Sequence, residues 1–144
     1  MSLQRPVRDT LVAAIHLPCR IRPMPRPRKG KNGQMYTPME VMKDMIHWLT
    51  KAEVTLPNEP MIFDLYIHFK EPEVNSPGFP ITKFYGDEDN LRKAINDCMV
   101  HAGMLEDDCL CLGGETYKTF ADSDYAWLLA YSVKDEVQVY DVDV

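Results

Sequence analysis

Residues 61–69 alternate between two sets of side chains, which is the period expected of a half-buried strand. One set is Met61, Phe63, Leu65, Ile67 and Phe69, and the other is Ile62, Asp64, Tyr66 and His68. Successive side chains of a strand point to opposite faces of the sheet. We therefore expect a strand over these residues, with the first set packed against the core.

Three other apolar runs also predict strands. The first is LVAAIHLPCRI at residues 11–21, where Pro18 indicates an edge position or an early end. The last two cover residues 109–120 and 125–135, and the turn ADSD joins them. Cys109 and Cys111 fall in the run at 109–120, and no second Cys-x-Cys pair or nearby histidine pair completes a zinc site.

A first helix is indicated after residue 36. Thr37 and Pro38 suit the N-cap and the first helical position, and Glu40 completes a capping box three residues after the cap. The apolar residues that follow recur at i, i+3, i+4 and i+7, as in an amphipathic helix. They are Met42, Met45, Ile46 and Leu49, and we expect this helix to end near Ala52.

A second helix is predicted over residues 89–101, followed by Gly103 as a C-terminal stop. Its expected apolar side consists of Leu91, Ala94, Ile95, Cys98 and Ala102. Proline and glycine mark two long loops, one at residues 22–33 and one at 70–86. Together these patterns predict an α+β fold with the order β-α-β-α-β-β, in which a mixed sheet of about four strands packs with two helices.

Length and composition favour one domain over residues 1–144, with 45% hydrophobic residues to build its core. No apolar run approaches the roughly 18 residues of a membrane-spanning helix, and the N-terminus lacks the apolar stretch of a signal peptide. We therefore expect a cytoplasmic protein. The acidic tail at residues 135–144 is expected to be disordered or to shield the basic loop described next.

Positive charge is concentrated in one segment, although the chain as a whole carries −6. The segment at residues 20–35 contains six basic residues and no acid, which leaves −12 on the remainder. These residues are Arg20, Arg22, Arg26, Arg28, Lys29 and Lys31. Such a loop either binds phosphates locally or is a solvated surface that keeps the chain soluble.

Acidic residues gather at both ends of the second predicted helix. Asp87 and Asp89 stand at its start, Lys93 follows one turn later on the same face, and Asp107 and Asp108 come after the helix. If the chain returns on itself after Gly103, three carboxylates converge, and hard oxygen ligands of this kind suit Mg²⁺ or Mn²⁺. The alternative is that Asp87 and Asp89 only cap the helix and the later pair lies in a turn.

At these residues the sequence resembles the RusA-like Holliday junction resolvases, many of them encoded by phages and prophages. The family's pattern is an Asp-x-Asp-Asn-x-x-Lys helix start, a later aspartate on the helix and a following Asp-Asp pair. Here these elements are Asp87, Asp89, Asn90 and Lys93, then Asp97, then Asp107 and Asp108. The basic segment RPRKGKNGQMYTP at residues 26–38 is also similar to the family, so the resemblance spans about residues 15–133.

The resemblance implies a Mg²⁺-dependent endonuclease that acts as a homodimer on four-way DNA junctions in recombination and repair, with Mn²⁺ as a possible substitute ion. It implies that Asp87, Asp89, Asp108 and Lys93 are catalytic, that the three aspartates bind the metal, and that Asp107 is a further candidate ligand. The basic residues from Arg20 to Lys31 are the expected DNA contacts, with Tyr36 as an aromatic candidate beside them.

Two features depart from the family pattern. Glu88 and Glu106 add acid where apolar residues are expected, and the polar Gln that often follows the Asp pair is absent. These departures affect the expected metal affinity and substrate preference more than the reaction type. Two other readings are a junction-binding protein that has lost cleavage, and a small acidic metal-binding or interaction protein without a DNA partner.

Overall fold

The computed structural model describes residues 1–36, 39–74 and 76–143. Its strands are β1 (Ser2–Leu17), β2 (Arg28–Lys29), β3 (Met35–Tyr36), β4 (Met61–Lys70), β5 (Thr116–Ala121) and β6 (Tyr125–Asp141). Its helices are α1 (Lys43–Lys51) and α2 (Glu88–His101), with short 3-10 turns η1 (Met39–Met42) and η2 (Asp108–Leu110). Apart from the small β2–β3 pair, this is the predicted element order.

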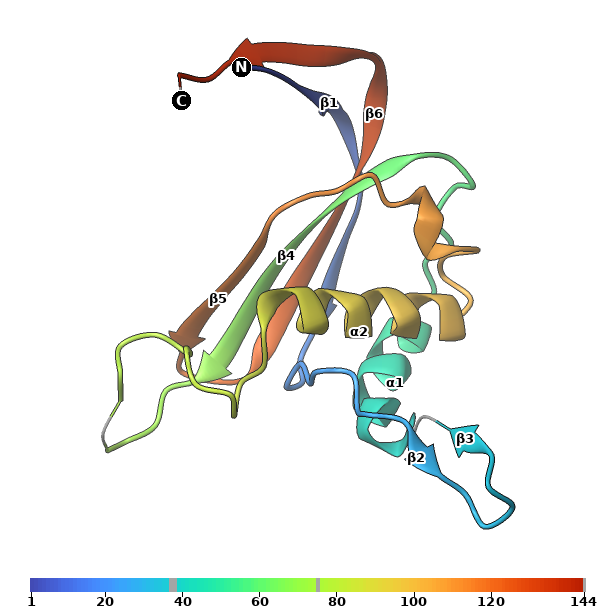
Figure 1. The fold of residues 1–144 in the computed structure, drawn as a ribbon, viewed down its shortest axis with the longest axis vertical. Coiled ribbons are helices and arrows are strands. Elements are labelled where there is room, and N and C mark those ends of the chain that lie inside the picture. Colours follow the sequence, from blue (N-terminus) through green and yellow to red (C-terminus); the bar gives the residue numbers. More distant parts are fainter. Residues whose placement is uncertain (37–38, 75, 144) are drawn as a thin grey trace.

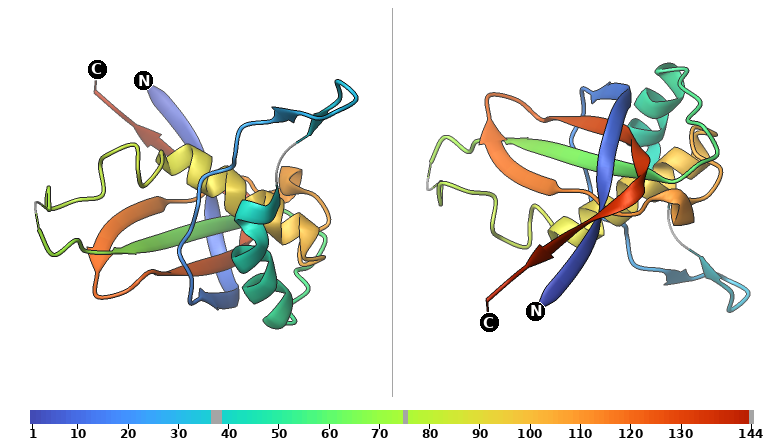
Figure 2. Two further views of the ribbon diagram at one scale, coloured as in Figure 1. Left: turned by 90° about the horizontal axis from the view of Figure 1, so that it is seen from below. Right: turned by 90° about the horizontal axis from the view of Figure 1, so that it is seen from above.

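Four strands form one mixed sheet in the order β1-β6-β4-β5. β6 pairs antiparallel with both β1 and β4, whereas β4 and β5 are parallel and are connected through α2. A parallel pair needs a crossover connection, which α2 and its flanking loops supply. Both helices cover one face of the sheet (Figures 1 and 2), so the predicted α+β architecture is confirmed.

The core lies between the sheet and the helices. The five alternating residues predicted to face inward from β4 are all buried, and they pack with buried residues of α1 and α2. From α2 these are Leu91, Ala94, Ile95, Cys98 and Met99. Ala102 lies at the margin of this core, and Gly103 ends the helix with a φ of 73°, a conformation that favours glycine.

The opposite face of β4 is less open than its alternation suggested. Ile62 and Asp64 are buried on it as well. Arg8 covers Asp64 and donates hydrogen bonds of 3.0 and 2.7 Å to its two carboxylate oxygens. The backbone N–H of Glu115 donates a third, at 2.9 Å. A buried carboxylate requires such partners, so this pair ties β1 to β4 and β5.

The first strand is longer than predicted and ends before Pro18. β1 begins at Ser2, and its first half pairs with the end of β6 in register from Ser2↔Asp141 to Pro6↔Val137. Irregularities in this register between Pro6 and Ala13 accompany a bend, beyond which the two strands leave the sheet as a ribbon (Figure 1). We call the ribbon, residues 2–10 of β1 and 132–141 of β6, the arm.

The expectation of a disordered acidic tail is wrong for residues 135–141. Val137 and Val139 alternate with polar residues there, and the N-terminal strand supplies the hydrogen-bonding partner. The arm lies at the end of the molecule opposite the β2–β3 pair (Figure 1), so the tail does not shield the basic segment. Val144 lies outside the described residues.

The basic segment contains a small hairpin where only a loop was predicted. β2 and β3 pair through Arg28↔Tyr36 and Lys29↔Met35. Gly30 N–H donates to the carbonyl of Gln34 at 2.7 Å, and Gly33 turns the chain with a φ of 77°. We call residues 28–36 the basic hairpin. The predicted helix start at Thr37 and Pro38 lies outside the described residues, and α1 follows η1 as far as Lys51.

Cys109 and Cys111 do not lie on a regular strand, which corrects the prediction for residues 109–115. Cys109 lies in η2, and Cys111 makes an isolated parallel bridge to Met61 before β5 begins at Thr116. Consecutive glycines at 113 and 114 separate these parts of the chain. Within residues 1–36, 39–74 and 76–143, no helix has the length and apolar character needed to cross a membrane.

The face of the sheet away from the helices carries a row of aromatic side chains. His16, Trp127, Tyr66 and Tyr117 come from β1, β6, β4 and β5 and are direct neighbours in register. His16 stacks on Trp127 with ring centroids 4.8 Å apart, and Tyr66 lies 5.6 Å from Tyr117. All four belong to the exposed class, so the row is an open surface in the single chain.

Candidate functional site

The outer face of α2 carries polar side chains at helical spacing. Asn90, Lys93 and Asp97 lie at i, i+3 and i+7, so they share one side of the helix, while Leu91 and Ile95 are buried on the other. The three polar residues line a groove of about 320 Å³ together with Arg26 and its neighbours Met24, Pro25 and Pro27. The basic segment thus lies against the polar face of α2.

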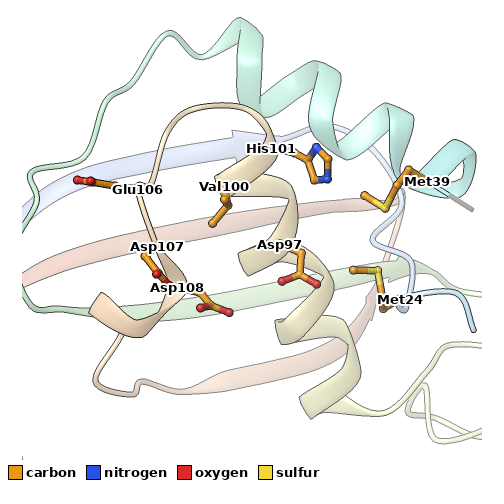
Figure 3. Close-up of a pocket in the computed structure, with 8 residues that line it drawn as sticks. All are labelled: Met24, Met39, Asp97, Val100, His101, Glu106, Asp107 and Asp108. Atoms are coloured by element: carbon orange, nitrogen blue, oxygen red, sulfur yellow. The ribbon is translucent and has the colours of Figure 1, made fainter. Parts of the chain in front are cut away.

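A larger cavity, of about 530 Å³, begins where this groove ends. It is lined by Asp97, Val100 and His101 of α2, by Met24 and Met39, and by Glu106, Asp107 and Asp108 (Figure 3). Asp97 borders both hollows, so they form one continuous surface along α2. The chain returns after Gly103 as predicted, but η2 brings Asp108 beside the C-terminal half of α2 and not beside Asp87 and Asp89, where it was expected.

Asp107 and Asp108 have different environments although they are adjacent. Asp107 caps η2, and its Oδ1 accepts the backbone N–H of Cys109 at 3.0 Å. That hydrogen bond stabilises the ionised form and lowers the pKa of Asp107. Asp108 shares a hydrogen bond with Asp107 and lies near the negative charge of Asp97, and both effects raise the pKa of Asp108. The cavity therefore concentrates negative charge on one side.

Arg92 fixes the distance between α2 and the segment that follows η2. Its Nη2 donates to the carbonyl oxygens of Phe63 and Gly113 at 2.7 and 2.8 Å, and its Nη1 donates to Thr116 Oγ1 at 3.0 Å. Gly114 permits this approach, because a Cβ there would lie 1.8 Å from the carbonyl oxygen of Phe63. Arg92 thus links the helix that bears Asp97 to the strand that follows Asp108.

Asp87 and Asp89 lie at the other end of α2. Asp87 is the N-cap residue, but its side chain makes no capping hydrogen bond, and Asp89 Oδ1 accepts only the adjacent N–H of Asn90, at 2.9 Å. A capping role for Asp87 therefore lacks its defining contact. Eight residues of helix, roughly 12 Å along the axis, separate Asp89 from Asp97. Among the described residues, no three His, Cys, Asp or Glu side chains are grouped closely enough to hold a metal.

The donor set nevertheless fits a hard divalent cation. Mg²⁺ is commonly bound through only one or two carboxylates, because it retains several of its water ligands. Asp97 and Asp108 line the same cavity, and the negative charge of Asp97 contributes to the raised pKa of Asp108, so a cation between these carboxylates would reduce their repulsion. Asp97 was not among the predicted ligands, although its position four residues after Lys93 placed it on the same helical face.

The predicted DNA contacts divide into two groups. Arg22, Arg26, Arg28, Lys29 and Lys31 are exposed, as is Tyr36 on β3. Arg20 is engaged within the protein instead: its Nη2 donates to the carbonyl oxygen of Phe84 at 3.2 Å, and its guanidinium lies 4.3 Å from the centre of the Phe84 ring. Arg20 is thus the member of the set least available to phosphate.

Two comparisons bear on this combination of an acidic cavity, a lysine on the neighbouring helical turn and a basic hairpin. A search of curated proteins gave no significant match. The family model described as Endodeoxyribonuclease RusA matches residues 18–125, which include the basic segment, α2, η2 and β5. Because this match spans most of the chain, the protein belongs to the RusA endodeoxyribonuclease family.

Proposed function

We propose that this protein is a metal-dependent endonuclease that resolves Holliday junctions and other branched DNA by paired nicks, in recombination and repair. The observation that supports the proposal is that Asp97, Asp107 and Asp108 line one cavity, with Lys93 in the adjoining groove, in a RusA family member. Because its substrate is DNA, the same proposal assigns the protein to the cytoplasm of a bacterial or phage-infected cell.

Asp108 is the central metal ligand in this proposal. The family pattern adds Asp87 and Asp89, and the geometry adds Asp97, with Asp107 holding η2 through its cap. A bound Mg²⁺ or Mn²⁺ would polarise a phosphoryl oxygen and lower the pKa of a coordinated water. Lys93, exposed in the adjoining groove, orients the scissile phosphate and offsets the negative charge that develops on it during hydrolysis.

The exposed cations of the basic segment bind the DNA backbone. Arg26 lines the same groove as Lys93, and the basic hairpin continues the positive surface away from the acids. Replacing Arg26, Arg28 and Lys29 by alanine should make junction binding less sensitive to salt. The magnitude of the negative slope of log K against log salt should fall by about 3, since each lost phosphate contact removes about one. An unchanged slope would exclude the hairpin from the interface.

Paired nicks require two active sites, so we include a twofold homodimer in the proposal. The aromatic row across the open face of the sheet is the surface best suited to it, because tyrosine and tryptophan are enriched in interfaces. The charged groups Asp64 and Glu115 on this face are already bonded, to Arg8 and Tyr117. A Trp127→Glu variant should sediment as a monomer, and a wild type that is monomeric at micromolar concentration while making paired nicks would contradict the dimer.

The alternative is a junction-binding protein without cleavage. To separate the two, labelled four-way junction, linear duplex and flap DNA are incubated with purified protein, in Mg²⁺ and in chelator. We expect symmetric cleavage of the junction in Mg²⁺ only. Junction binding without cleavage in either Mg²⁺ or Mn²⁺ would favour the alternative, and a lack of binding to all three DNAs would exclude both functions.

A further inference from the structure

The loop before α2, residues 76–86, exposes large apolar side chains. Phe79, Ile81 and Phe84 retain 64, 72 and 69% of their accessible surface. Single exposed apolar residues are ordinary, but three in one loop form a surface that normally has a binding partner. Because the loop leads directly into Asp87, whatever binds there lies next to the N-terminal end of the proposed active helix.

Contacts with the rest of the protein fix the backbone of this loop. Tyr85 is buried and packs against Phe69, with ring centroids 5.0 Å apart, and Pro80 is buried between the two exposed residues that flank it. Lys118 Nζ donates to the carbonyl oxygen of Gly86 at 2.8 Å. The exposed side chains are therefore displayed on an anchored backbone, which lowers the entropy cost of binding.

Arg20 supports Phe84 in particular. Its guanidinium lies over the Phe84 ring at 4.3 Å and is hydrogen-bonded to the carbonyl oxygen of the same residue. One face of the ring is thus occupied by a cation while the residue stays largely exposed. Arg20 is also the first residue of the basic segment. The segment that is proposed to bind phosphates therefore contacts Phe84 through Arg20.

Beside Phe84 lies a hollow of about 370 Å³. Its lining includes Arg20, Lys70, Glu71, Glu73, Tyr85 and Asp124. With three acids and two bases, the hollow does not favour a phosphate group. It offers hydrogen-bond donors and acceptors next to an aromatic face, which suits a neutral, planar, polar molecule such as a nucleobase.

The loop and the basic hairpin lie at opposite ends of α2 (Figures 1 and 2). DNA that follows the helix would therefore meet cations at one end and exposed apolar side chains at the other. Proteins that open or kink DNA insert apolar side chains between bases in this way. Opening a base costs unstacking and unpairing energy, and this cost is lower at a branch point, where the regular stack of the duplex is interrupted.

We propose that Phe84, with Phe79 and Ile81 of the same loop as further apolar contacts, stacks against a base that is opened at the branch point of the DNA and that the adjoining hollow receives the base edge. This inference rests on the proposed junction-binding function. It assigns recognition of the branch to the loop at 76–86, whereas the basic hairpin binds the backbone without regard to branching.

The test uses a four-way junction with 2-aminopurine at the branch point, bound in Ca²⁺ to prevent cleavage. We expect its fluorescence to rise on binding wild type, because the base leaves its neighbours in the DNA. Phe84→Ala should abolish the rise and weaken junction affinity roughly tenfold, with little effect on duplex affinity. Phe84→Trp should retain both properties, since it keeps a stacking ring.

Tyr140→Ala on the arm is the matched control, as it removes an exposed aromatic ring far from α2. Melting temperatures establish that the variants are folded. If Phe84→Ala binds and perturbs the junction like wild type, the inference is wrong while the proposed function stands. A change of oligomeric state in Phe84→Ala would also overturn it, in favour of a protein interface. If wild type binds no junction, the proposed function itself has failed.

Discussion

The two faces of α2 differ in what they require of their residues. The inner face packs Leu91, Ala94 and Ile95 against the sheet without exposed surface, whereas the outer face presents Asn90, Lys93 and Asp97 to two connected hollows. The inner residues lower the free energy of the fold, whereas Asp97 on the outer face raises it through repulsion with Asp108. The inner face of one helix thus contributes to stability and its outer face to the proposed catalysis. Substitutions on the inner face should lower the free energy of unfolding but not cleavage, and substitutions on the outer face should lower cleavage but not stability.

The largest effect should come from the acids that line the cavity beside the outer face, Asp97 and Asp108. Asp108→Asn and Asp97→Asn keep the side-chain shape but remove a negative charge, so we expect junction cleavage to fall by at least about 100-fold. Junction affinity in Ca²⁺ should hold or improve, and the melting temperature of the metal-free protein should hold or rise. Cleavage assays, binding assays and thermal melts on each variant measure the three quantities.

Asp87→Asn and Asp89→Asn extend this test to the other end of the helix. A loss of cleavage in them as large as in Asp108→Asn would support the ligand set implied by the family pattern. If only Asp97→Asn and Asp108→Asn lose cleavage, the metal lies at the cavity. If all four variants cleave at the wild-type rate, neither metal assignment survives.

The inner face should show the opposite signature. Ile95→Ala leaves a cavity between α2 and the sheet and should lower the free energy of unfolding by about 2–5 kcal/mol. Cleavage per folded molecule should be unchanged well below the melting temperature. Urea unfolding measures the loss, with Val137→Ala on the exposed arm as the control, expected to cost less than about 0.5 kcal/mol. A core variant with normal stability but no cleavage would break the separation between the faces.

Substitution of Arg92 should lower both stability and cleavage, whereas substitutions on either face of α2 should lower only one of them. Arg92→Met leaves the carbonyl oxygens of Phe63 and Gly113 without their donor, which should cost roughly 2 kcal/mol of stability. Because Arg92 also holds the segment that follows η2 against α2, we expect cleavage to fall by about tenfold and metal affinity to weaken. Calorimetric titration with Mn²⁺ separates these effects, since a purely structural role would leave metal affinity unchanged in the folded protein.

The smallest effect should be on the pH dependence of metal binding. The pKa of Asp108 is raised and only its ionised form binds a cation, so metal affinity should fall at a higher pH than for an ordinary aspartate as the solution is acidified. Asp107→Asn removes the main cause of this shift and should move the midpoint to lower pH. A midpoint that moves upward, or not at all, would exclude coupling between the two carboxyl groups.

Stability should depend only weakly on this pair. The raised pKa of Asp108 gives a contribution that is full at low pH and is lost as the pH rises through the folded-state pKa. The lowered pKa of Asp107 gives a contribution present above its unfolded pKa and lost as the pH falls. The two have opposite signs and both groups are exposed, so melting temperature is a poor reporter of their coupling.

Local periodicity predicted β4 and α2 closely, because the spacing of apolar residues within each element identifies the face that is buried. The β4 alternation and the Leu91-to-Cys98 spacing both appear in the buried core. The return of the chain after Gly103 was also foreseeable, because glycine ends helices. That turn predicted that Asp108 returns toward α2, but Asp108 was expected beside Asp87 and Asp89 and lies beside Asp97 instead.

Features that depend on distant pairing could not be predicted in the same way. Nothing near residues 135–141 identifies Ser2–Pro6 as their pairing partner. The prediction of a disordered tail therefore depended only on the negative charge of these residues. The hydrogen-bonding partners of Arg92 and Arg20 lie 19 to 64 positions away, and neither set of contacts follows from local pattern. Similarly, the proximity of Asp97 to Asp108 depends on how η2 packs, not on spacing along the helix.

The position of β6 inside the sheet has a consequence for the order of folding during synthesis. β6 lies between β1 and β4, and every register pair between β1 and β6 joins residues more than 100 positions apart. Until residues 125–141 leave the ribosome, β1 has no neighbour in the sheet and the apolar residues of β4 lack part of their cover. Such distant contacts slow folding and leave a transient strand edge open, so the nascent chain should depend on chaperones until β6 emerges.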